Sequence, residues 1–111
     1  MANAFKSVTA QNVGTAQVSV YECPAATSTT MIGMTIANTA SSQILVDVQM
    51  KDASNSNTQI HIVKDAPIPV GGSLVVLGGD QKVVFEVSDS MNVTSDTTTS
   101  ADVVLSFLEI T

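Results

Sequence analysis

Residues 60–87 read IHIVKDAPIPVGGSLVVLGGDQKVVFEV and set three apolar runs between proline and glycine residues. The first and last runs, residues 60–63 and 83–87, are short and rich in β-branched types, which favours strands over helices. Between them, Pro67 and Pro69 cannot lie inside a helix or donate to a central ladder. We therefore expect residues 67–69 to form a rigid extended connector or an edge strand.

Two glycine pairs flank the middle apolar run, residues 74–77. Gly71-Gly72 precedes this run and Gly78-Gly79 follows it, and glycine accepts the positive φ angles that tight turns require. The spacing predicts that the chain reverses direction twice within a few residues. The expected order is a strand, a proline bend and a tight hairpin. No Lys-Ser or Lys-Thr pair follows at the spacing of a phosphate loop, so these glycines indicate turns.

The clearest alternation of apolar and polar residues lies in residues 43–51 and 101–110. Apolar residues occupy the even positions from 44 to 50, and polar residues occupy the odd positions from 47 to 51, as in a half-buried strand. Residues 101–110 are apolar on both faces, which is typical of a central strand or of a strand buried against another subunit. The predicted core residues are Val46, Val48, Val83, Phe85, Val103 and Leu105.

The whole chain gives about eight such strands, with turn signals every ~8–12 residues and no apolar stripe of helical period. Sheets of this kind bury their apolar faces by stacking in pairs. The sequence therefore predicts an all-β fold, an antiparallel β-sandwich of immunoglobulin-like or jelly-roll topology. We expect one sandwich domain over residues 14–111, preceded by an N-terminal arm or edge strand over residues 1–13.

Charged residues are scarce and mostly acidic. They make up 13% of the 111 residues, against roughly 25% in ordinary globular proteins, and the net charge is -6. The chain has no Arg, which argues against a nucleic-acid partner, and its acidity argues against an anionic membrane. We find no secretory signal pattern and no apolar run near the ~20 residues of a spanning helix, so we expect synthesis in a cytoplasm.

Residues with catalytic or metal-binding potential are isolated from one another. His61 is the only histidine and lies in the middle of a predicted strand, and Cys23 is the only cysteine. A loop with Asp52, Asn55 and Asn57 offers oxygen ligands but lacks the spacing and the bidentate Glu of a calcium hand. The sequence therefore predicts no catalytic residue, no cofactor and no metal, and the protein is not expected to be an enzyme.

The last predicted strand points to an interface. Val104, Leu108 and Ile110 lie opposite its core face, so an isolated domain would leave them in water. We predict that they bind another subunit together with the proline segment at Pro67 and Pro69. In the intramolecular alternative, the N-terminal arm around residues 5–8 folds over this strand and covers it.

Five segments resemble a family of small virion proteins of tailed bacteriophages, notably those of marine cyanobacteria. They are VYECPA (20–25), IGMTIANT (32–39), VKDAPIPVGGSL (63–74), GGDQK (78–82) and DVVLSFLEI (102–110). The resemblance implies a non-enzymatic component of the virion, made in the host bacterial cytoplasm. It does not separate a capsid decoration or cement protein from a neck or tail adaptor. The partners it implies are further copies of the chain and other virion proteins, such as the major capsid, portal, neck or tail proteins.

A second class of function stays open at this point, a module on the virion that binds a carbohydrate or a host-surface receptor. Sugar sites usually use exposed aromatic rings as stacking platforms. This chain has no Trp, one Tyr and three Phe. The scarcity of aromatic residues favours the structural subunit.

Overall fold

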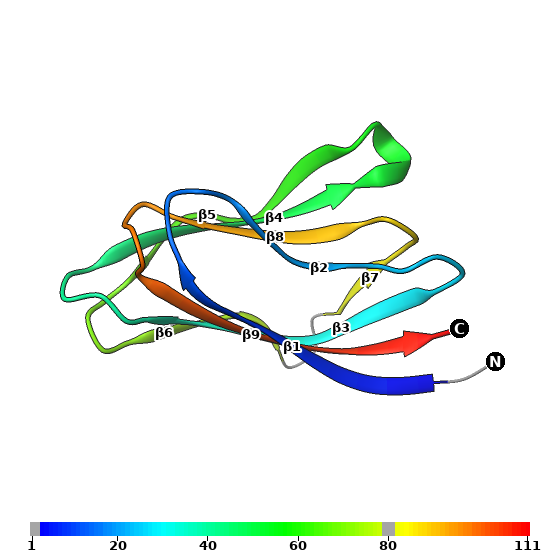
Figure 1. Ribbon diagram of the computed structural model, residues 1–111, viewed down its shortest axis with the longest axis horizontal. Coiled ribbons are helices and arrows are strands. Elements are labelled where there is room, and N and C mark those ends of the chain that lie inside the picture. Colours follow the sequence, from blue (N-terminus) through cyan, green and yellow to red (C-terminus); the bar gives the residue numbers. More distant parts are fainter. Residues whose placement is uncertain (1–2, 79–81) are drawn as a thin grey trace.

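The computed structural model of the protein describes residues 3–78 and 82–111 and is a sandwich of two antiparallel sheets (Figure 1). The five-stranded sheet has the order β1-β9-β3-β6, with β7 also paired to β3, and the four-stranded sheet has the order β2-β8-β4-β5. The described strands are β1 (Asn3–Val13), β2 (Val18–Glu22), β3 (Ser28–Asn38), β4 (Ile44–Asp52), β5 (Thr58–Ile68), β6 (Ser73–Leu77), β7 (Val83–Phe85), β8 (Ser90–Ser95) and β9 (Ala101–Ile110). The predicted all-β sandwich is confirmed.

The connectivity is that of a jelly roll. Among the described strands, only β4 and β5 are consecutive in the chain and adjacent in one sheet, where they form a hairpin with a short 3₁₀ turn at Ala53–Asn55. The chain otherwise passes from one sheet to the other between β1, β2, β3 and β4, and again from β5 to β6 and from β7 through β8 to β9. An immunoglobulin domain instead keeps several consecutive pairs within one sheet. Of the two predicted topologies, the jelly roll is the one observed.

The predicted tight hairpin after the proline segment is wrong. β6 and β7 do not pair with each other, because both pair with β3 in the same antiparallel sense. β6 lies along residues 34–37 of β3 and β7 lies along residues 29–31, so the two form successive parts of one edge. The expected turn at Gly79 lies outside the described residues. Counted as one interrupted strand, β6 and β7 bring the total to the predicted eight.

Side chains from both sheets fill the space between them. Along β4, Ile44, Val46 and Val48 are fully buried, which confirms the predicted inward face of that strand. Phe85, Val103 and Leu105 are also buried as predicted, whereas Val83 is only partly buried against the core. On β9 the core-facing residues alternate with partly or fully exposed ones, because this strand lies between β1 and β3 with one face open.

An irregularity in β3 changes which residues face the core. Its pairing with β9 shifts between Met31 and Gly33, so Met31 and Met34 are both buried. Ile32 falls within the shift and is only partly buried, although simple alternation along the strand would place it on the same face as Met34 and Ile36. A β-bulge of this kind inserts one residue and reverses the alternation beyond it.

β1 and β5 each form one edge of their sheets. β1 lies beside β9 at the edge of the five-stranded sheet and pairs with it from Asn3 to Val13 (Figure 1). β5 forms an edge of the four-stranded sheet and continues through Pro67. Because an edge strand has a neighbour on one side only, the N–H that proline lacks does not interrupt the pairing of inner strands.

Among the described residues, no helix has the length and apolar character needed to cross a bilayer.

Candidate functional site

The outer face of the five-stranded sheet carries exposed apolar side chains among Ser and Thr residues. Cross-strand pairing places its outward side chains in rows, because directly opposite residues share a face. One row is Phe5, Leu108, Thr30 and Val84, and a second is Thr9, Val104, Thr35 and Val75. Four of these side chains remain largely in water, with exposed fractions of 79% for Phe5, 65% for Val75, 57% for Val84 and 49% for Val104. We call this surface the apolar face.

The outer face of the four-stranded sheet has the opposite character. Its cross-strand rows are Ser19, Asn92, Gln49 and His61, and then Glu22, Ser90, Lys51 and Gln59. Of these, Ser90 and Asn92 on the inner strand β8 are buried. By contrast, Asp102 is the one charged residue at the outward positions of the described strands of the five-stranded sheet. The two sides of the sandwich therefore differ in polarity. One carries charged and amide side chains, and the other carries exposed Val and Phe side chains beside Ser and Thr.

The structure gathers some of the predicted interface residues and separates others. Val104, Leu108 and Ile110 all lie on the outward side of β9, within the apolar face. Pro67 belongs to β5 of the other sheet, and Pro69 lies in the connection from β5 to β6. Both prolines are exposed, but the structure does not place them on the apolar face.

The N-terminal segment does not cover the last strand in the way the intramolecular alternative supposed. It pairs edge to edge with β9, so Phe5 lies next to Leu108 on the same outward surface. The ring of Phe5 is the most exposed large apolar side chain among the described residues. β1 therefore widens the apolar face and leaves it open to water.

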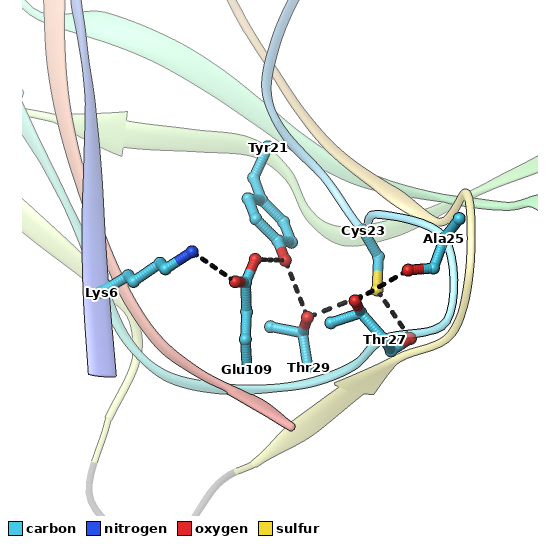
Figure 2. Close-up of polar contacts among 7 residues, drawn as sticks. All are labelled: Lys6, Tyr21, Cys23, Ala25, Thr27, Thr29 and Glu109. Carbon is cyan, nitrogen blue, oxygen red and sulfur yellow. Dashed lines mark hydrogen bonds and ion pairs between the residues drawn. The ribbon is translucent and has the colours of Figure 1, made fainter. Parts of the chain in front are cut away.

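A buried polar network crosses from one sheet to the other at the end of the sandwich where β1 begins and β9 ends (Figure 1 and Figure 2). The Glu109 carboxylate of β9 faces the interior and accepts a hydrogen bond of 2.6 Å from the Tyr21 hydroxyl of β2. The Lys6 ammonium of β1 lies 2.7 Å from the other carboxylate oxygen. The exposed fraction of the Glu109 side chain is 8%, and that of Lys6 is 55%, so the cation reaches in from the sheet edge.

The network continues through two more side chains. The Thr29 hydroxyl lies 2.7 Å from the Tyr21 hydroxyl and 3.3 Å from the sulfur of Cys23. The Cys23 thiol also donates to the Thr27 carbonyl at 3.3 Å. Among the described residues, no buried side-chain nitrogen or oxygen is left without a hydrogen-bond partner. Each polar group here is satisfied, as a buried network requires for stability.

The shifted pKa values of Glu109 and Tyr21 determine which groups of the network are charged at neutral pH. Hydrogen bonds from Lys6 and then Tyr21 lower the pKa of Glu109 below its ordinary value of 4.5, so it is ionised at neutral pH. Burial, followed by the hydrogen bond to Glu109, raises the pKa of Tyr21 well above its ordinary value of 10.0. Tyr21 therefore stays neutral and keeps donating to the carboxylate.

This arrangement ties the two sheets together and offers no reactive group. The Glu109 carboxylate is already paired, the Tyr21 hydroxyl is held neutral and the Cys23 thiol is buried. His61 lies on the outer face of β5, opposite Gln49 and apart from the network. Among the described residues, no group of three His, Cys, Asp or Glu side chains is placed to hold a metal ion, and no ligand-sized pocket is formed.

We expect Tyr21→Phe to lower the free energy of unfolding by about 1–3 kcal/mol at pH 7, because Glu109 and Thr29 lose a buried partner. The raised pKa of Tyr21 means that its contribution is present below pH 10.0 and is lost as the pH rises beyond it. Urea unfolding should thus show a difference in the free energy of unfolding between wild type and Tyr21→Phe at pH 7, and this difference should narrow above pH 10. Equal stability at pH 7 would show that the network does not stabilise the fold.

No family model matches the chain. No curated protein matches its sequence. Solved structures do share its fold. A chain in the capsid structure of Helicobacter pylori bacteriophage KHP30 is 8% identical with a TM-score of 0.58, and the match covers 100% of this chain and 94% of that one.

Two further structures show how widely this fold occurs. A chain from the Bacillus endospore appendages, described as disulfide-linked pili, is 10% identical with a TM-score of 0.55, covering 98% of this chain and 88% of that one. A chain of the Gx strain of infectious bursal disease virus is 10% identical with a TM-score of 0.57, covering 97% of this chain. The match spans only 31% of that viral chain. At these identities, the likeness to viral and pilus β-sandwich proteins is one of fold.

Proposed function

We propose that the protein is a non-enzymatic structural subunit of a tailed-phage virion, either a capsid decoration or cement protein or a neck or tail adaptor. The observation that supports this is the difference between the two sides of the sandwich. One outer face is polar, and the other presents Phe5, Val75, Val84 and Val104 to water. Exposed apolar side chains gathered on one face are what a protein–protein interface requires, so this surface supports the proposal.

The fold comparisons support a role in particle assembly. The KHP30 chain of the same fold occurs in a capsid structure, and it matches this chain over nearly all of both lengths. Jelly rolls build shells because their edges and flat faces can meet neighbouring subunits. The partners we infer are further copies of this chain and other virion proteins, such as the major capsid, portal, neck or tail proteins.

The alternative, a virion module that binds a carbohydrate or a host-surface receptor, is less well supported. Tyr21, Phe85 and Phe107 are all buried, and Phe5 is the one exposed aromatic ring. A single ring on a flat sheet does not form the stacking cleft that sugar binding usually requires. The polar loops remain the place where such binding should be sought, by glycan arrays with the purified protein.

An enzymatic role has no support from the described residues. The acid, phenol and thiol at the core are each held by hydrogen bonds, and none lines a pocket. A catalytic group must reach a substrate and change its protonation state at the working pH. The buried network satisfies neither condition.

We expect Leu108→Asp to reduce incorporation into virus particles by at least about tenfold, which corresponds to about 1.4 kcal/mol of lost contact energy per site. Leu108 lies on the apolar face between Phe5 and Thr30, where a carboxylate would be buried without a partner once the face is covered. Incorporation is measured by mass spectrometry of purified particles assembled with the variant in place of the wild type.

The matched control is Ser19→Asp, at an exposed outward position of β2 on the polar outer face. It adds the same charge and should leave both melting and incorporation unchanged. Leu108→Asp should lower the melting temperature by only a few degrees, since its side chain points away from the core. If Leu108→Asp unfolds the domain, or if it enters particles as well as the control does, the apolar face is not the interface.

A further inference from the structure

We propose that β1 is an exchangeable strand, so that residues 3–11 of one copy occupy the edge of β9 in a second copy. Lys6 of the first copy then pairs with the buried Glu109 of the second. This inference goes beyond the proposed function, because it concerns self-association of the purified chain and holds whether or not the chain belongs to a virion. Four features of the described residues support it.

The first feature is that most of β1 is weakly held by the core. Its inward positions are Ala4, Lys6, Val8 and Ala10, and none of them is fully buried. β9 contributes Val103, Leu105 and Phe107 to the core at the opposite positions of the same ladder. Detaching residues 3–11 therefore removes backbone pairing and one ion pair and exposes few large apolar side chains of β1 itself.

The second feature is that the base of β1 is firmly anchored. Val13 is buried, and its carbonyl accepts a hydrogen bond of 3.0 Å from the Ser100 amide. The Gly14 carbonyl accepts one of 2.9 Å from the Ser95 amide. A Cβ at Gly14 would lie 3.1 Å from the Thr99 nitrogen, so this backbone is closely packed on the loop between β8 and β9. An exchange would thus move the strand and leave its base in place.

The third feature is a hinge between the loose and the anchored parts. The pairing of β1 with β9 is irregular between Ala10 and Val13. Within this irregularity, Asn12 has a φ of 59°, a left-handed conformation that Asn adopts more readily than most residues with a side chain. Extending the hinge to reach a second copy changes this φ and breaks the 3.0 Å hydrogen bond that the Asn12 amide donates to the Asp102 carboxylate. A short irregular segment of this kind can serve as the hinge when the element that it connects is exchanged.

The fourth feature is that the edge of β9 accepts only a strand with a suitably placed cation. The side chain of Glu109 is 8% exposed and needs a cation at the register that Lys6 occupies. An empty edge would leave this buried carboxylate without a charge partner and the β9 backbone groups on that side unpaired. β1 meets both needs, so the occupant of this edge is either the chain's own β1 or the β1 of a second copy.

Concentration decides between these two occupants. Exchange forms the same contacts again in another copy, so the two states differ mainly at the hinge. The chain's own strand competes at an effective concentration of the order of millimolar. We therefore expect a closed monomer in dilute solution and exchanged copies where the local concentration reaches this range, as it does for subunits placed side by side.

Disulfide trapping between two different variants tests the exchange. Ser7 of β1 lies directly opposite Ser106 of β9 on the outward side of the ladder. The Ser7→Cys and Ser106→Cys proteins are unfolded in urea, mixed, refolded at about 1 mM and then oxidised. This protein concentration is similar to the effective concentration of the chain's own tethered strand. We expect a disulfide-linked heterodimer joining positions 7 and 106, identified by peptide mass spectrometry. A closed monomer cannot form this link within either chain.

The control replaces Ser106→Cys with Gln49→Cys, an outward position of the other sheet. The heterodimer of the test pair should exceed that of the control pair by at least about tenfold, because pairing in a strand holds the thiols together. Wild-type protein measures any background from the buried Cys23. A yield equal to that of the control pair would overturn the proposal.

Charge reversal supplies a second and independent measurement. Lys6→Glu and Glu109→Lys each place two like charges together in a closed monomer, so each protein alone should melt at a lower temperature than the wild type. When the two proteins are refolded together, reciprocal exchange restores opposite charges at both sites. We expect a dimer of twice the monomer mass that melts at a higher temperature than either variant alone. A mixture that melts as the two separate proteins and stays monomeric would contradict the exchange.

Discussion

Phe85→Ala is expected to lower the free energy of unfolding by about 3–5 kcal/mol, which is a large part of the total stability of a domain this small. Phe85 is fully buried at the end of β7, and its ring centroid lies 6.4 Å from that of Tyr21 on the opposite sheet. Removing the ring leaves a cavity beneath the polar network, where Tyr21 also packs on Phe107. Urea unfolding followed by circular dichroism measures the loss.

Val84→Ala is the matched control for this substitution. Val84 precedes Phe85 in the same strand and lies on the outward side, so its truncation removes exposed side-chain atoms. We expect its effect to stay within about 0.5 kcal/mol. A loss of less than about 1 kcal/mol for Phe85→Ala would mean that the end of the sandwich closes over the missing ring.

The strands that could be predicted from the sequence are those in which a single physical constraint acts over many residues. In β4, one face lies on the core and the other faces outward, so apolar and polar residues alternate over residues 46–51. In β9, the same alternation assigned Val103 and Leu105 to the core and Val104 to the other face, and the structure agrees. Such patterns survive because a shift of one residue would invert every side chain.

The arrangement around β3 could not be predicted, because it depends on contacts between distant segments. Glycines after Leu77 indicate a change of direction, but they do not reveal whether the next strand pairs with β6 or continues along β3. The shift between Met31 and Gly33 leaves no mark in the local composition either. Bulges are fixed by the partner strand, and the partner is known only once the fold is known.

The sequence contains one sign of the buried network, and it comes from the two-residue alternation along β9. Counting along β9 from Val103 by twos reaches Leu105, Phe107 and then Glu109, so a carboxylate falls on the core face of the strand. A charged residue in that register requires a partner, and the sequence does not identify which of the four lysines supplies it. Lys6 is brought there by the pairing of the first strand with the last, a contact between the two ends of the chain.

Lys6→Met is expected to lower the free energy of unfolding by about 2–3 kcal/mol at pH 7. The estimate lies between the small effect of a surface pair and the 3–5 kcal/mol of a fully buried one, because Glu109 is buried while Lys6 is half exposed. The methionine keeps the length of the side chain and its contact with the sheet edge. What is lost is the cation, so the carboxylate is left with Tyr21 as its hydrogen-bond donor.

The pH dependence separates this loss of charge from a loss of packing. In the wild type, the pKa of Glu109 is held below its ordinary value of 4.5, so the stabilisation is present above pH 4.5 and is lost as the pH falls through the lowered value. The difference in the free energy of unfolding between wild type and Lys6→Met should therefore disappear in acid. Lys64→Met, which removes an exposed lysine 3.6 Å from Asp65, should cost less than about 0.5 kcal/mol at either pH. A gap for Lys6→Met that persists unchanged at pH 3 would show that Lys6 acts through packing and not through its charge.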